Sequence, residues 1–125
     1  SEAQAAANTI DAGYVTDGEL RALYERAYCF VYPSFYEGFG LPPLEAMHSG
    51  CPVIVSDRAS LPEVCGEAAL YCNPERPETI SKAMSRLLDN PALRDELIEK
   101  GRQRVKLFTW KECAEKVLSH ISEFI

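Results

Sequence analysis

The sequence predicts an α/β fold in which helices flank a partial parallel sheet and the last third of the chain is helical. Short apolar runs rich in β-branched and aromatic residues alternate with segments whose apolar residues recur at helical spacing. Alternation of this kind favours a parallel sheet. The composition, with 46% hydrophobic and 26% charged residues among 125, is typical of a globular domain.

The candidate strands are few and short. We expect them at residues 9–15, 29–32, 52–55 and 69–72. The second is continuously apolar, which is typical of a strand buried on both faces. Nucleotide-binding sheets commonly have about five or six strands, so an open edge is expected here, of the kind that proteins cover or pair. Because the first candidate begins near residue 9, we expect the missing strands upstream.

Capping-box patterns, Ser or Thr followed three residues later by Glu, predict helix starts after Thr16, Ser60 and Thr109. Gly50 predicts the end of a helix over residues 42–49. After Thr109, one face of the predicted helix is apolar. Its members are Trp110, Cys113, Ala114, Val117, Leu118 and Ile121.

In the C-terminal third, apolar residues at helical spacing predict a helix around residues 80–88. Asn90 before Pro91 predicts the start of another. The dense basic run at 102–106 is interpreted as a solvated helix face.

The net charge, the cysteines and the histidines argue against several classes of function. The net charge of −6 argues against a nucleic-acid partner, which would require a basic face. The five cysteines include no C-x-x-C pair, and we interpret them as small buried residues of a reducing cytosol. The two histidines lack ligand spacing to a cysteine, so no metal is expected. No apolar stretch reaches the length of a membrane span.

The chemistry is expected in the loop that joins the strand at 29–32 to the helix at 42–49. Gly38 and Gly40 allow a sharp turn and a close approach to a ligand. The free N–H groups and positive dipole end of the following helix suit a phosphate. Pro42 and Pro43 have no N–H, so an anion would be held mainly by the amides of residues 39–41. The Lys-Ser/Thr ending of a P-loop is absent.

Two carboxylates flank this turn, with seven residues between them: Glu37 and Glu45. Carboxylates accept hydrogen bonds from sugar and ribose diols. Taken singly, each has a plainer interpretation: Glu37 as an exposed loop acid, Glu45 as a complement to the helix dipole, and the glycines as a tight turn without a ligand.

Taken together, these motifs resemble the C-terminal domain of retaining, GT-B-fold glycosyltransferases of family 4, the glycosyl transferases group 1. The resemblance runs from Gly13 to the end of the chain. It is carried by GYVTDGELRALYERA, YPSFYEGFGLPPLEAMHSGCPVIVSD, SLPEVCGEAALYCNP and the closing FTW. It implies a Rossmann-like sheet of which the chain, residues 1–125, is an incomplete nucleotide-sugar-binding domain.

The resemblance also implies roles for matching residues. Glu37 would be catalytic, supporting the donor sugar and an oxocarbenium-like transition state. Glu45 would bind the ribose hydroxyls, and Val15 would lie against the nucleobase. The sugar and distal phosphate would be held by the backbone of Gly38, Phe39, Gly40 and Leu41.

The implied reaction is transfer of a sugar from a nucleoside diphosphate to an unidentified acceptor, with retained configuration and without a metal or other cofactor. The absence of an Asp-x-Asp motif agrees with this. The family's acceptor-binding domain and its Arg and Lys at the diphosphate have no counterpart in this chain, so we expect the isolated chain to be inactive. A cytoplasmic location is expected, with peripheral association at the inner membrane face through the absent N-terminal domain as a further possibility.

Two other classes stay open at this level. One is a non-catalytic module that binds a nucleotide sugar weakly and pairs with another chain to complete the sheet. The other is a GT-B epimerase or phosphorylase relative, against which the two glutamates followed by Ala46 and Met47 favour the transferase.

Overall fold

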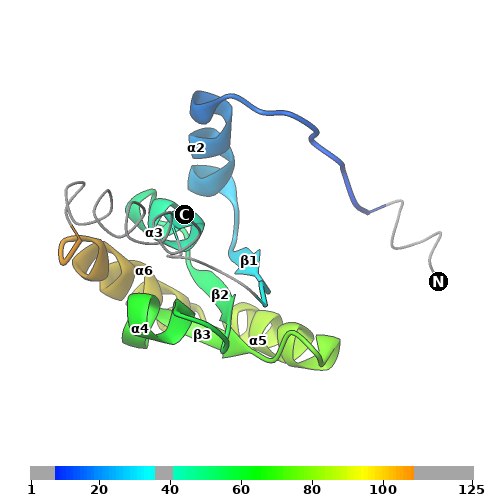
Figure 1. Ribbon diagram of the computed structural model, residues 1–125, viewed down its shortest axis with the longest axis vertical. Coiled ribbons are helices and arrows are strands. Elements are labelled where there is room, and N and C mark those ends of the chain that lie inside the picture. Colours follow the sequence, from blue (N-terminus) through cyan, green and yellow to red (C-terminus); the bar gives the residue numbers. More distant parts are fainter. Residues whose placement is uncertain (1–7, 36–40, 109–125) are drawn as a thin grey trace, which may run out of the picture.

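A three-stranded parallel sheet with helices on both faces forms the body of the protein (Figure 1). The computed structural model describes residues 8–35 and 41–108. The strands are β1 (Phe30–Tyr32), β2 (Val53–Ser56) and β3 (Ala69–Cys72). The helices are α2 (Asp17–Arg26), α3 (Leu41–His48), α4 (Leu61–Cys65), the short 3₁₀ helix η1 (Gly66–Ala68), α5 (Pro77–Asp89) and α6 (Pro91–Val105).

The strands lie in the order β1-β2-β3, so strands that follow one another in the sequence are also neighbours in the sheet. In register, Val31 pairs with Ile54, and Ile54 pairs with Leu70. Every residue of β2 is buried, as its central position requires. The prediction that 29–32 is buried on both faces is confirmed in part. Phe30 and Tyr32 pack against one core and Val31 against the other, but the residues of β1 are only half-buried, because β1 has only β2 as a neighbour in the described sheet.

Two apolar cores lie on opposite faces of the sheet, because alternate residues of a strand point in opposite directions. Val53 and Val55 pack with side chains of α2, α3 and α4. Ile54 packs on the other face with side chains of α5 and α6. Helix α6 also contacts α3, where a Cβ on Gly101 would lie only 3.2 Å from the Cγ of Met47. Gly101 therefore permits the close approach of α6 and α3.

The N-caps predicted at Thr16 and Asn90 and the C-cap predicted at Gly50 are present in the structure. The Thr16 capping box forms on α2, with Thr16 Oγ1 accepting from Glu19 N at 3.1 Å and Glu19 Oε1 accepting from Thr16 N at 3.0 Å. Asn90 accepts from Leu93 N at the start of α6. Gly50 ends α3 with a φ of +78°, as predicted for a C-cap glycine.

The capping box predicted at Ser60 does not form, although α4 does begin at Leu61. Ser60 has φ −86° and ψ 0°, which is a helical backbone. A capping side chain needs an extended backbone to reach the N–H groups of the first turn. The capping box at Thr109 lies outside the described residues.

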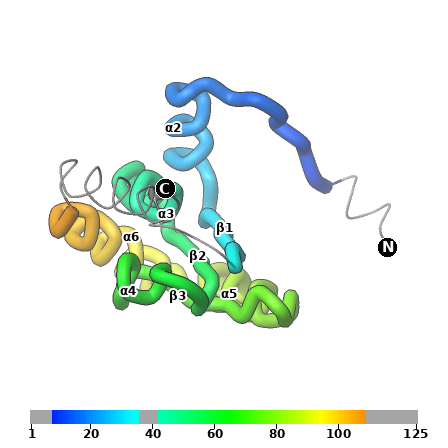
Figure 2. Tube along the Cα trace, viewed as in Figure 1, coloured from blue at the N-terminus to red at the C-terminus, as the bar shows by residue number. Residues whose placement is uncertain are grey.

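The strand predicted over residues 9–15 is wrong in this structure. The segment is irregular, and Figure 2 shows it running away from the sheet beyond α2. Ile10 and Tyr14 are 91% and 107% exposed, so neither is packed. An apolar run becomes a strand only where a neighbouring strand accepts its hydrogen bonds, and no described strand lies beside it.

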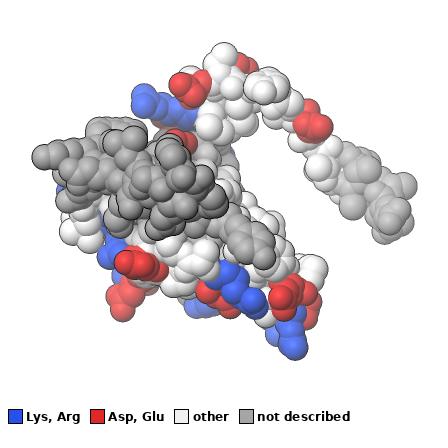
Figure 3. All heavy atoms as spheres, in the orientation of Figure 1, with Lys and Arg blue, Asp and Glu red and all other residues white. Residues whose placement is uncertain are grey.

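The basic run at 102–106 was interpreted as a solvated helix face, but Arg104 within it is partly buried and binds another helix. Arg104 donates from Nε to the Val64 carbonyl and from Nη2 to the Glu63 carbonyl, each at 2.7 Å. These carbonyls belong to the last residues of α4, which lack partners within their own helix. Arg104 therefore fastens α6 to the end of α4. Elsewhere acidic and basic side chains are interspersed on the surface, as the edge that carries α4 and α5 shows (Figure 3).

The prediction that the cysteines are small, mostly buried residues is confirmed for the four that the structure describes. Cys51, Cys65 and Cys72 are buried, Cys29 is partly buried, and all four are free thiols. Burial raises the pKa of the Cys51 and Cys65 thiols to about 11 each. Cys113 lies outside the described residues. No helix in the described part of the chain has the length and apolar character needed to cross a bilayer.

Candidate functional site

The structure describes three of the seven residues predicted for the site. Leu41 is the first residue of α3, and Glu45 lies one turn further along the helix. Val15 is partly buried just before Thr16, the N-cap of α2. Glu37, Gly38, Phe39 and Gly40 lie outside the described residues, so their roles stay predictions.

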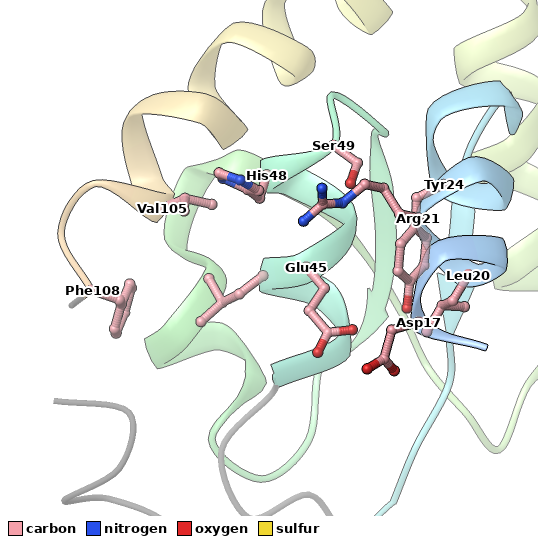
Figure 4. A pocket seen from close by; sticks show the side chains of 10 residues that line it. Asp17, Leu20, Arg21, Tyr24, Glu45, His48, Ser49, Val105 and Phe108 are labelled. Atoms are coloured by element: carbon pink, nitrogen blue, oxygen red, sulfur yellow. The ribbon is translucent and has the colours of Figure 1, made fainter. Parts of the chain in front are cut away.

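A pocket of about 510 Å³ lies over α3, between α2 and the end of α6 (Figure 4). The pocket runs along α3 from Leu44 to Ser49, and its described lining comes from α2, α3 and the end of α6 rather than from the residues that directly follow the strands. Glu45 is among its lining residues. The full lining is Asp17, Leu20, Arg21, Tyr24, Leu44, Glu45, His48, Ser49, Val105 and Phe108.

Two carboxylates share the α2 side of the pocket. Figure 4 shows Asp17 of α2 and Glu45 of α3 pointing toward one another. Within residues 8–35 and 41–108, neither forms an ion pair. Glu45 is exposed, but partial burial raises the pKa of its carboxyl above the usual value, and the charge of Asp17 raises that pKa further. The two carboxylates are thus placed to accept hydrogen bonds from one polyhydroxyl ligand.

Tyr24 forms the inner wall beside Glu45. Its ring is buried and packs edge to face on Phe30, with ring centroids 5.2 Å apart. Burial raises the pKa of the Tyr24 phenol, and the nearby Glu45 carboxylate raises it further, so the hydroxyl stays protonated and can donate. Arg21 extends on the same side toward Ser49 (Figure 4).

Asp17, Arg21 and Tyr24 were not predicted as site residues. A sequence signal exists for the first two, because a spacing of four places them on one face of α2. The spacing does not say which face meets α3. That depends on Leu20 and Tyr24, which pack α2 against the core below the pocket.

The chain belongs to the glycosyl transferases group 1 family, whose model matches residues 1–104. The match begins before Gly13 and ends before the closing FTW, the two limits of the resemblance noted in the sequence. The family match agrees with the α/β fold and its parallel sheet.

The relatives that this chain matches include two proteins named as mannosyltransferases. The chain is 44% identical over 107 residues to O-antigen chain mannosyltransferase B of Escherichia coli, covering 86% of this chain and 28% of that protein. It is 38% identical over 109 residues to MMP alpha-(1->4)-mannosyltransferase of Mycolicibacterium hassiacum, covering 84% of this chain and 26% of that protein. The chain therefore spans little more than a quarter of either relative.

Solved structures agree with the family and confirm the expected fold class. Sucrose-phosphate synthase from Thermosynechococcus elongatus matches with a TM-score of 0.81 and 31% identity, covering 98% of this chain and 32% of that one. The C-terminal domain of a group 1 family glycosyl transferase from Francisella tularensis matches with a TM-score of 0.68 and 28% identity, covering 76% of this chain and 50% of that one. The chain is thus part of the C-terminal domain of a group 1 glycosyltransferase.

Proposed function

We propose that this chain is the donor-binding part of a hexosyltransferase that takes a sugar from a nucleoside diphosphate and transfers it with retained configuration. The observation that carries the proposal is the position of Glu45, whose carboxylate faces α2 across a pocket of about 510 Å³. That volume lies in the range of small-ligand sites. A carboxylate that forms no ion pair with any described residue, beside an apolar wall, suits the hydroxyls of a ribose.

Other residues of the chain are proposed to bind the phosphate, the sugar and the base of the donor. Leu41 begins α3, so the amides of residues 39–41 and the positive end of α3 would hold the distal phosphate. Preorganised amides would also stabilise the charge that develops on the departing diphosphate, in place of a metal. Glu37 would support the positive charge on the donor sugar, and Val15 would lie against the base.

Relatives support the enzyme rather than a non-catalytic binding module, since those compared above are named as glycosyl transferases or a synthase. Because two of them are named mannosyltransferases, mannosyl nucleotides are the first donors to test. The acceptor is proposed to bind outside this chain, which covers only a fraction of those proteins.

The test is calorimetric titration of GDP-mannose, UDP-glucose and ADP-glucose into the full-length enzyme, with steady-state kinetics. We expect Glu45→Gln to weaken donor binding by roughly 10-fold or more, the value of a hydrogen bond to a charged group. Turnover should fall less, because ribose contacts persist from ground state to transition state. Glu67→Gln is the control, since Glu67 is exposed in η1 and does not line the pocket.

Unchanged donor affinity in Glu45→Gln would contradict the ribose assignment. Glu37→Gln should instead reduce turnover most strongly, and normal turnover in that variant would exclude a role at the reaction centre. Transfer activity in the isolated 125-residue chain would refute its proposed dependence on the rest of the enzyme.

A further inference from the structure

The hydroxyl of Tyr24 is a polar group of the pocket that has no partner among the described residues. Tyr24 belongs to the apolar core and is only 7% exposed. Its ring is held in place by the edge-to-face contact with Phe30. The hydroxyl nevertheless forms no hydrogen bond to any residue of 8–35 or 41–108. A phenylalanine would fill the same core position without an unpartnered oxygen.

The hydroxyl opens into the pocket that Tyr24 lines, because no side-chain oxygen of the described residues is both fully buried and unpartnered. Figure 4 shows this hydroxyl on the side of the pocket where the carboxylates of Asp17 and Glu45 lie. The charge of Glu45 is near enough to raise the pKa of the Tyr24 phenol, yet Tyr24 donates to neither carboxylate. A donor and two acceptors therefore surround a space that none of them fills.

This set of groups distinguishes between classes of ligand. A buried polar group without a partner is unfavourable, so the hydroxyl indicates a ligand atom that accepts its hydrogen bond. A phosphate would accept from Tyr24 but would be repelled by the two carboxylates. An ammonium group would pair with the carboxylates but has no acceptor for Tyr24. A sugar hydroxyl accepts and donates at once, so it can bridge Tyr24 and Glu45.

We propose that Tyr24 is a further specificity residue of the donor site, whose hydroxyl donates to the ribose diol while the carboxylates of Asp17 and Glu45 accept from it. The assignment rests on the proposed function, which places the ribose at Glu45. It makes the site selective for ribonucleotides. A deoxyribose lacks one oxygen of the diol and leaves the groups that would bind it unpaired, which is the strongest basis on which a site rejects an analogue.

The test is calorimetric titration of GDP-mannose and of its 2′-deoxy and 3′-deoxy analogues into the full-length enzyme and its Tyr24→Phe variant. Tyr24→Phe should weaken the binding of GDP-mannose by about 3- to 10-fold, the value of one hydrogen bond between neutral groups. The unchanged enzyme should prefer GDP-mannose over each deoxy analogue. Tyr24→Phe should reduce the preference by about the same factor for the analogue that lacks the hydroxyl bound by Tyr24.

Thermal unfolding separates a binding role from a structural one. Because the hydroxyl has no described partner, Tyr24→Phe should leave the Tm of the ligand-free enzyme unchanged or slightly raised. The rise in Tm that GDP-mannose produces should become smaller. Tyr28→Phe is the matched control, since the Tyr28 hydroxyl donates to the Leu87 carbonyl at 3.0 Å and Tyr28 does not line the pocket. That variant should lower the Tm and keep the donor affinity.

Three results would overturn the assignment and leave the proposed function intact. In the first, Tyr24→Phe binds GDP-mannose as tightly as the unchanged enzyme does. In the second, the variant weakens GDP-mannose and both deoxy analogues equally, so the hydroxyl binds another part of the donor. In the third, Tyr24→Phe lowers the Tm of the ligand-free enzyme as much as Tyr28→Phe does, so the hydroxyl serves the fold. If the unchanged enzyme binds none of GDP-mannose, UDP-glucose and ADP-glucose, the proposed function itself is wrong and the assignment of Tyr24 is wrong with it.

Discussion

Arg104 is predicted to be a main link between α6 and α4, and its removal should weaken the fold measurably. Its two hydrogen bonds to the carbonyls of Val64 and Glu63 are both 2.7 Å long. A hydrogen bond to a charged group contributes about 1.5–3 kcal/mol. Both bonds are partly open to water, so water replaces part of what Arg104→Ala removes, and we expect a loss of about 2 kcal/mol.

The assay is urea unfolding of the chain followed by far-UV circular dichroism. A loss of about 2 kcal/mol corresponds to a fall in Tm of roughly 8 °C for a chain of this size. The urea midpoint should fall while the m-value stays the same, because the surface exposed on unfolding is nearly unchanged. Arg104→Lys should recover about half of the loss, since an ammonium keeps the charge but not the forked geometry.

Arg102→Ala is the control, because Arg102 is exposed on the same helix and forms no ion pair within the described residues. Its effect should stay within about 0.5 kcal/mol. If Arg104→Ala unfolds at the same urea concentration as Arg102→Ala, the anchoring role of Arg104 is wrong.

Three further predictions concern packing, charge and thiol reactivity. Gly101→Val should destabilise the chain by about 2 kcal/mol in the same assay, since even a Cβ would lie 3.2 Å from Met47, whereas Gly18→Ala, with nothing within 4 Å of its Cβ, should be neutral or stabilising. The pKa of Glu45 is raised by partial burial and by Asp17, so its ionised form opposes folding. Glu45→Gln should therefore raise the free energy of unfolding at pH 7 by up to about 1 kcal/mol. Urea titrations should show this gain shrinking as the pH falls through the raised pKa of Glu45 and gone below the ordinary glutamate pKa of about 4. Burial raises the pKa of Cys51 to about 11, so peptide mapping should show slow alkylation by iodoacetamide at pH 8 until urea unfolds the chain.

Much of the fold was predictable because it rests on local signals. The last of the four candidate strands was predicted over residues 69–72, which are the bounds of β3. The caps at Thr16 and Asn90 also form as predicted, since a cap needs only a short polar side chain and the N–H groups of the next turn. The helix that carries Leu41 and Glu45 was also predicted, over residues 42–49, and the structure has it as α3, Leu41–His48, while the binding roles of both residues stay predictions.

Other features depended on which segments meet in space. The Ser60 pattern is the same as that at Thr16, but the chain reaches α4 with a helical backbone and the box cannot close. Residues 9–15 have a strand-like sequence and no described strand beside them. The sequence likewise gave no reason to separate Arg104 from its basic neighbours, because the carbonyls it binds belong to residues about forty positions earlier.

The sequence by itself determined that a glycine-containing loop leads into a helix bearing Glu45, at the end of a parallel strand. Periodicity and capping are properties of adjacent residues, so they can be interpreted without a structure. Only the tertiary structure decided that α2 lies across from α3 and places Asp17 opposite Glu45, with Tyr24 as the inner wall beside them. That arrangement is set by the packing of both helices on one face of the sheet, which no local signal encodes.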